Sequence, residues 1–153
     1  MRKRGRVLSV ALAMALGLGA AAGTAQGAGD EAVIKYRQAV MKGQSAHLGA
    51  MFQIVKGGAG NADQLKAHAH GLDELSKMIP SAFSQRTDGG KTEAKSEIWD
   101  DAAGFKKVAA DMEKAADDLL AAVESGDEAA IGKALGAAGD GCKGCHKTYR
   151  VQK

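Results

Sequence analysis

The sequence has very little of what strands and large aromatic cores require. It contains one proline, two cysteines and 4% aromatic residues in 153 positions. No stretch alternates β-branched and polar residues, so no sheet is predicted. The apolar positions recur instead with the spacing of helices, between segments rich in alanine and glycine. The composition and this spacing together predict an all-α protein.

The N-terminus has the parts of a secretory signal. "MRKRGR" is a basic start, and "VLSVALAMALGLGAAAG" is too short and too rich in Ala and Gly for a convincing membrane span. Small residues follow, so cleavage is expected after Ala25 or Gly27. We therefore predict a signal peptide over 1–27, one domain over 28–153, and a periplasmic protein that is not embedded in the membrane. An uncleaved N-terminal anchor is the alternative.

Removal of this segment changes the charge balance. The full chain has 21 Lys and Arg against 18 Asp and Glu. The basic residues Arg2, Lys3, Arg4 and Arg6 leave with the signal, so 17 basic and 18 acidic residues remain. A surface with this balance gives no support to a nucleic-acid partner.

Four segments of the mature chain carry helical periodicity, over residues 30–55, 61–79, 100–124 and 127–150. Glycines in "KGGAGN", then Pro80, then "SGD" separate them, and Asn61 and Asp127 are expected N-caps. With two short connections and one long one, the segments predict an antiparallel four-helix bundle. The expected apolar stripes are Ile34, Met41, Leu48, Phe52 and Val55; Leu65, His68, Leu72, Leu75 and Ile79; Phe105, Val108, Met112, Ala115, Leu119 and Ala122; and Ile131, Leu135, Ala138, Cys142, Cys145 and Tyr149.

Both cysteines occur in "GCKGCHKTYR", on the core-facing stripe of the last segment, and His146 follows them directly. A CxxC redox switch normally lies beside a parallel sheet, which this chain lacks. A zinc site would need His68 and His70, but residues two apart on a helix point about 200° away from each other. Simple packing of two small thiols explains the stripe and leaves His146 without a role.

Covalent haem attachment accounts for the whole motif, because C-x-x-C-H is the pattern of c-type haem. Cys142 and Cys145 lie one turn apart on one helix face, which suits thioethers to two vinyl groups of one porphyrin. His146 would then present its imidazole to the iron. A planar macrocycle would also fill a core that has few aromatic side chains.

The sequence resembles the class II c-type cytochromes, the cytochrome c′ family, over nearly all of the mature chain. The segments that carry the resemblance are "YRQAVMK", "MFQIVKG", "IPSAF", "TEAKSEIW" and "CKGCHKTYR". "KMIPSAF" departs from the family pattern, since it lacks the common Leu before the proline. The resemblance implies a four-helix bundle that holds one haem c near its C-terminus. Cys142 and Cys145 would be its thioether positions, and His146 its proximal iron ligand.

The resemblance also extends to the surroundings of the haem. Arg37, Gln38, Thr92 and Glu93 are similar to residues that approach the haem propionates. Arg150 is similar to a basic residue often found beside the proximal histidine. Each of the five also has an ordinary interpretation as a solvated surface residue.

The resemblance also implies that Met41 faces the distal side of the haem. If its thioether ligates the iron, the iron is six-coordinate and low-spin, which suits electron transfer. If Met41 only packs, the iron is five-coordinate and can bind NO or CO. The sequence alone does not decide between these two alternatives.

Three functions follow from these alternatives. The first is a periplasmic carrier of single electrons with protein redox partners, and the second is a five-coordinate protein that binds NO or CO. The third is a helical export protein without haem, stapled by a disulfide or by zinc. No acid–base pair, activated nucleophile or phosphate loop is recognisable, so an enzyme is not expected. A homodimer is a plausible assembly, since members of the family often pair through their first two helices.

Overall fold

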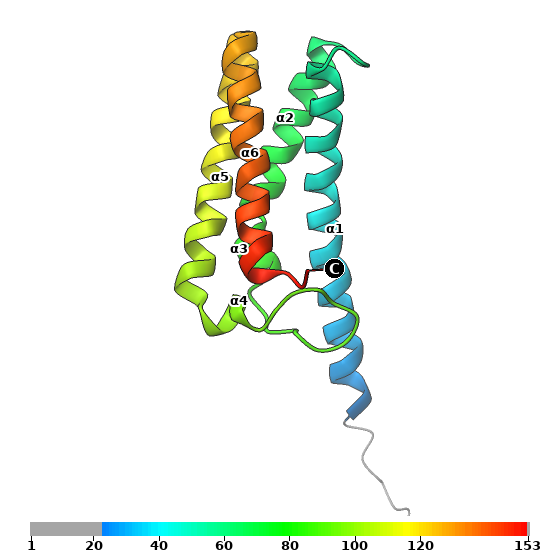
Figure 1. The fold of residues 1–153 in the computed structure, drawn as a ribbon. Coiled ribbons are helices and arrows are strands. Elements are labelled where there is room, and N and C mark those ends of the chain that lie inside the picture. Colours follow the sequence, from blue (N-terminus) through cyan, green and yellow to red (C-terminus); the bar gives the residue numbers. More distant parts are fainter. Residues whose placement is uncertain (1–22, 153) are drawn as a thin grey trace, which may run out of the picture.

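The computed structural model describes residues 23–152 and shows an antiparallel four-helix bundle, as predicted (Figure 1). The long helices are α1 (Gly23–Val55), α2 (Ala62–Lys77), α5 (Ala102–Ser125) and α6 (Glu128–Tyr149). The single turns α3 (Ile79–Ala82) and α4 (Glu97–Asp100) flank the long connection. The predicted signal over 1–27 lies largely outside the described residues. Within residues 23–152, no helix combines the length and apolar character needed to span a bilayer.

Both predicted caps are present in the structure. The Asn61 side chain accepts the backbone N–H of Gln64 at 3.0 Å, at the start of α2. The Asp127 carboxylate accepts two N–H groups at the start of α6, those of Ala129 at 2.9 Å and Ala130 at 3.1 Å. Each cap satisfies helix N–H groups that have no intrahelical partner.

Three predicted helix boundaries are wrong. The first helix begins at Gly23 rather than near Asp30. The second helix ends at Lys77 rather than at Pro80, and Pro80 lies in the first turn of α3, where a missing N–H costs no hydrogen bond. The third predicted helix is divided at Asp101, which ends α4 and caps α5 by accepting the N–H of Gly104 at 3.1 Å.

The core follows the predicted stripe of the last helix closely. Ile131, Leu135, Ala138 and Tyr149 are buried, and the two cysteines are half-buried among them. The first helix departs from the prediction. Its buried residues include Arg37 and Gln44, whereas Val55 is 41% exposed.

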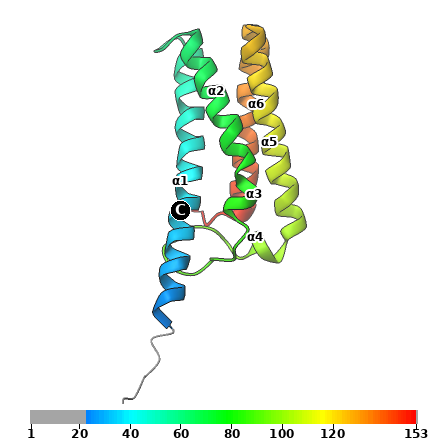
Figure 2. The ribbon, with the colours of Figure 1, turned by 180° about the vertical axis from the view of Figure 1, so that it is seen from behind.

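The long helices pack as pairs, α1 with α2 and α5 with α6, and α2 also packs against α5. Figure 2 shows α2 next to α1 at one end of the bundle and away from it at the other. Helices α1 and α6 share few contacts. The bundle therefore opens between α1 and α6, at the end where the long connection and the C-terminus lie (Figure 1).

Candidate haem site

A cavity of about 660 Å³ lies in this opening, between α1, α5, α6 and the long connection. Its volume is in the range of sites for small molecules and cofactors. Much of its wall is apolar, and this part comprises Met41, Ile79, Phe83, Ile98, Phe105, Val108, Ala109 and Met112.

The wall formed by α6 contains Cys142, Cys145 and His146 together. Both thiols are free, and Cys142 Sγ lies 3.8 Å from the sulfur of Met112. Burial raises the pKa of both thiols, that of Cys145 to about 11. This disfavours the thiolate form that a zinc site or thiol exchange would need.

The His146 side chain is half-buried in the last turn of α6. Its pKa is lowered, first by burial and then by the positive charge of Arg150, while Glu93 acts in the opposite direction. The imidazole is therefore neutral at pH 7, which is the form that ligates a metal. Its backbone carbonyl accepts hydrogen bonds from Arg150 N at 3.2 Å and Gln152 Nε2 at 2.7 Å, so the turn that carries it is held in place.

Arg37 fastens the long connection to α1. Its guanidinium is buried and donates to Thr87 Oγ1 and to the Thr87 carbonyl, both at 2.8 Å, and to Thr92 Oγ1 at 3.2 Å. It also lies over the rings of Phe83 and Trp99, at 5.0 and 5.4 Å from the centroids. Burial lowers its pKa, with the charge of Asp88 opposing the shift. The guanidinium nevertheless stays charged, since an arginine does not lose its proton in proteins.

The other end of the connection is held on α6. Ala94 forms an antiparallel bridge with Arg150, and Val151 N donates to the Glu93 carbonyl at 2.8 Å. The Arg150 side chain donates to the Glu93 carboxylate, from Nε at 2.8 Å. On the α1 side, Gln38 Nε2 donates to the Lys91 carbonyl at 2.9 Å.

The five residues predicted to surround the haem thus all line the cavity. Their polar groups hold residues 87–94 in place across its edge, a role that the sequence did not predict. The partner positions Thr87 and Lys91 carry no local signal, because each bond joins residues 50 or more positions apart. Met41 lies on α1, is half-buried, lines the same cavity and packs against the core.

These residues fit a haem. Two sulfurs and an imidazole share one wall, apolar side chains form much of the remainder, and polar groups gather at one edge. Cys142 and Cys145 would hold the macrocycle, and His146 would hold its iron. When bound, the haem supplies an iron with a further coordination position and two accessible redox states.

The zinc interpretation of the cysteine motif is wrong. His68 and His70 lie on α2 outside the cavity, where His68 contacts His47 and His70 is 3.7 Å from Glu124. Within the part of the chain that the structure describes, no group of three or more His, Cys, Asp and Glu residues could hold a metal ion.

Comparison with known proteins agrees with this geometry. The protein family described as cytochrome C′ matches residues 32–150. A cytochrome c′ from Pararhodospirillum photometricum is 40% identical over 124 residues, which are 80% of this chain and 99% of that protein.

Two solved structures of a cytochrome c′ from Alcaligenes xylosoxidans also match, each at 38% identity with a TM-score of 0.74. One is a ferrous variant with bound NO, and the match covers 81% of this chain and 97% of that one. The other is a variant with bound carbon monoxide, and the match covers 80% and 97%.

Proposed function

This chain belongs to the cytochrome c′ family and is a haem c protein, and we propose that it binds NO or CO at the iron that His146 would hold. The observation that carries the proposal is the match, over four-fifths of the chain, to one relative of which variants have been solved with each of these two ligands. NO and CO are small and uncharged, so a partly apolar cavity can admit them at little desolvation cost.

The residues that line the cavity have different roles in this proposal. His146 holds the iron from α6 with a neutral imidazole. Met41, Val108 and Met112 contribute apolar surface, which favours an uncharged ligand. In this proposal Met41 packs and does not ligate, so that the sixth position stays open.

The proposal is tested by the absorption spectrum of the ferrous protein with and without CO. A shift of the Soret band on addition of CO is expected, and an unchanged band would overturn the proposal. A Met41→Leu variant keeps the volume of the side chain and removes its sulfur. Its ferric spin state should equal that of the wild type, with Met112→Leu as the control from the same cavity. A change from low-spin to high-spin iron in Met41→Leu alone would identify Met41 as a ligand.

Electron transfer is the second candidate. Lys42 and Lys91 line the cavity, whereas the charge of Arg150 is paired with Glu93, so two lysines lie beside the site that would hold the haem. A redox partner with an acidic surface would be attracted to this edge. Electron exchange with an anionic mediator should be faster than with a cationic one of equal potential, and the difference should shrink as salt is added.

Three further properties belong to the proposal. The protein acts in the periplasm after export, it carries no catalytic activity of its own, and two copies pair as a homodimer. Fractionation of the producing cells and sedimentation of the purified protein test the first and the third.

A further inference from the structure

Two histidines from different helices face each other away from the haem cavity. His47 on α1 and His68 on α2 have their Nδ1 atoms 3.0 Å apart. Their rings meet at 65°, with centroids 5.2 Å apart, and both side chains are half-buried. Because the two Nδ1 atoms share one hydrogen bond, one ring carries its proton at Nδ1 and the other at Nε2.

Gly71 provides the space for this pair. It lies on α2, and a Cβ atom at this position would come within 2.7 Å of both His47 Nδ1 and His47 Nε2. Such contacts are too short for a side chain, so the His47 ring occupies the place that any other residue at position 71 would need. The ring is therefore seated against the α2 backbone.

The separation of the two nitrogens selects a coordination geometry. At metal–nitrogen bonds of about 2.0–2.1 Å, two nitrogens 3.0 Å apart subtend close to a right angle at the ion. Tetrahedral ligands would stand about 3.3 Å apart at the same bond length. Right-angled imidazole pairs are typical of tetragonal sites for Cu²⁺ or Ni²⁺, and Cu²⁺ binds most tightly in the divalent series.

We propose that His47 and His68 form a binding site for a divalent transition-metal ion, Cu²⁺ foremost, that bridges α1 and α2. The ion replaces the hydrogen bond between the rings and lies to one side of the line that joins the two Nδ1 atoms, about 2.0–2.1 Å from each. The ring that carried its proton at Nδ1 changes to the Nε2–H tautomer, so both Nδ1 lone pairs are free to bind and no net proton is released.

The site has two protein ligands, and water completes the coordination. No third His, Cys, Asp or Glu of the described residues joins the pair. Such a site exchanges its ion readily, in contrast to a closed structural site. Because the ion joins two helices of the folded state, binding also stabilises the fold. The proposal is independent of the haem and of the proposed function.

Titration of the haem-loaded protein with Cu²⁺ tests the site. Calorimetry should show one Cu²⁺ per chain, bound at least tenfold more weakly in His47→Gln and in His68→Gln. His70→Gln is the matched control, because His70 is exposed on the same helix and should leave the affinity unchanged. The electron paramagnetic resonance signal of bound Cu²⁺ should show two nitrogen ligands.

A Gly71→Ala variant tests the geometry while both histidines remain. Alanine favours the helix, so the variant should fold, but its methyl group displaces the His47 ring. Cu²⁺ should bind Gly71→Ala several-fold more weakly than it binds the wild type. Added Cu²⁺ should also raise the Tm of the wild type more than it raises the Tm of His47→Gln. Equal affinities in the wild type, His47→Gln and Gly71→Ala would overturn the proposal.

Discussion

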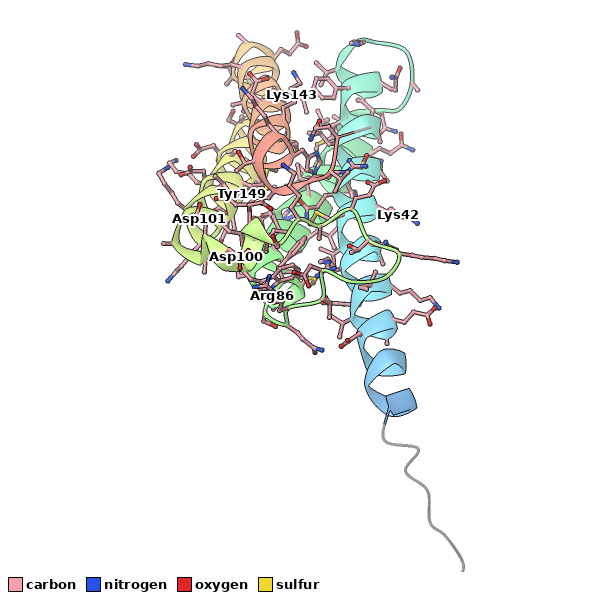
Figure 3. The ribbon with its side chains drawn as sticks, turned by 60° about the horizontal axis from the view of Figure 1, so that its bottom comes forward. Lys42, Arg86, Asp100, Asp101, Lys143 and Tyr149 are labelled. Carbon is pink, nitrogen blue, oxygen red and sulfur yellow. The ribbon has the colours of Figure 1, made fainter. Side chains whose placement is uncertain are left out.

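The hydroxyl of Tyr149 donates a hydrogen bond of 2.8 Å to the carboxylate of Asp101, which joins the last turn of α6 to the start of α5 (Figure 3). The other carboxylate oxygen of Asp101 caps α5 through Gly104 N. The Tyr149 ring lies edge-on to Phe105 at 5.3 Å and lines the haem cavity. Tyr149 thus holds in place the last turn of α6, the helix that carries His146.

Replacing Tyr149 by phenylalanine should lower the Tm by about 4 °C, because the change removes one partly buried hydrogen bond and leaves the Asp101 oxygen without its donor. Thermal unfolding followed by circular dichroism measures the effect. Tyr36→Phe is the control, since Tyr36 is 51% exposed. Equal Tm values for the two variants would contradict the assigned role of the bond.

The hydrogen bond between Tyr149 and Asp101 should also make the stability of the protein depend on pH. Hydrogen bonding to Asp101, followed by burial, raises the pKa of Tyr149 above its ordinary value. A group with a raised pKa contributes stability that is complete below the pKa of the unfolded chain and is lost as the pH rises through the folded value. The Tm difference between the wild type and Tyr149→Phe should therefore be constant near neutral pH and shrink in the alkaline range.

Arg37→Leu should release the long connection from α1. The variant loses three hydrogen bonds and leaves the Thr87 carbonyl without a donor, so the free energy of unfolding should fall by about 3 kcal/mol. Limited proteolysis within residues 83–96 should also become faster. Arg86→Leu is the comparison variant, because Arg86 also lies near Trp99 but is exposed, and its ion pairs with Asp88 and Asp100 are surface pairs that contribute little stability. If both variants are cleaved at the wild-type rate, Arg37 does not hold the connection.

Asp117→Asn should stabilise the protein at neutral pH. Asp73 is buried, and its Oδ1 has no hydrogen-bond partner among the described residues. Asp117 faces it from α5 and can donate to Asp73 only when it is protonated; this interaction, followed by burial, raises the pKa of Asp117. A neutral amide can donate to Asp73 without the repulsion between two carboxylates.

The raised pKa of Asp117 determines how the stabilisation by Asp117→Asn varies with pH. Protonated Asp117 contributes its full stability to the fold at low pH, and this contribution is lost as the pH rises through the folded pKa of Asp117. The Tm of Asp117→Asn should thus exceed that of the wild type by a few degrees at pH 7, and the difference should vanish in acid. Asp118→Asn should not raise the Tm, since Asp118 is exposed and pairs with Lys114 at 2.7 Å. A Tm of Asp117→Asn below the wild-type value at pH 7 would show that the two carboxylates do not repel.

The features that could be predicted from the sequence are local. The helix caps at Asn61 and Asp127 depend on residues two or three positions away, and the stripe that ends in Tyr149 follows from helical spacing alone. The motif around Cys142 is equally local, so the sequence locates one wall of the cavity.

The features that were missed depend on partners distant in the chain. Arg37 is buried because Thr87, fifty residues away, accepts its hydrogen bonds, and no periodic pattern contains that information. Asp73 is buried beside Lys77, which pairs with it, and it meets Asp117 only because α2 packs against α5. Likewise, His47 and His68 meet only because α1 and α2 pack in this register.

The mass of the purified protein, produced with its haem-attachment machinery present, tests the central claim most directly. We predict the mass of the mature chain plus one haem, with the modification on the peptide that contains Cys142 and Cys145 and with neither thiol open to alkylation. A colourless protein of unmodified mass, in which both thiols react freely, would contradict the assignment of this cavity to a covalently bound haem.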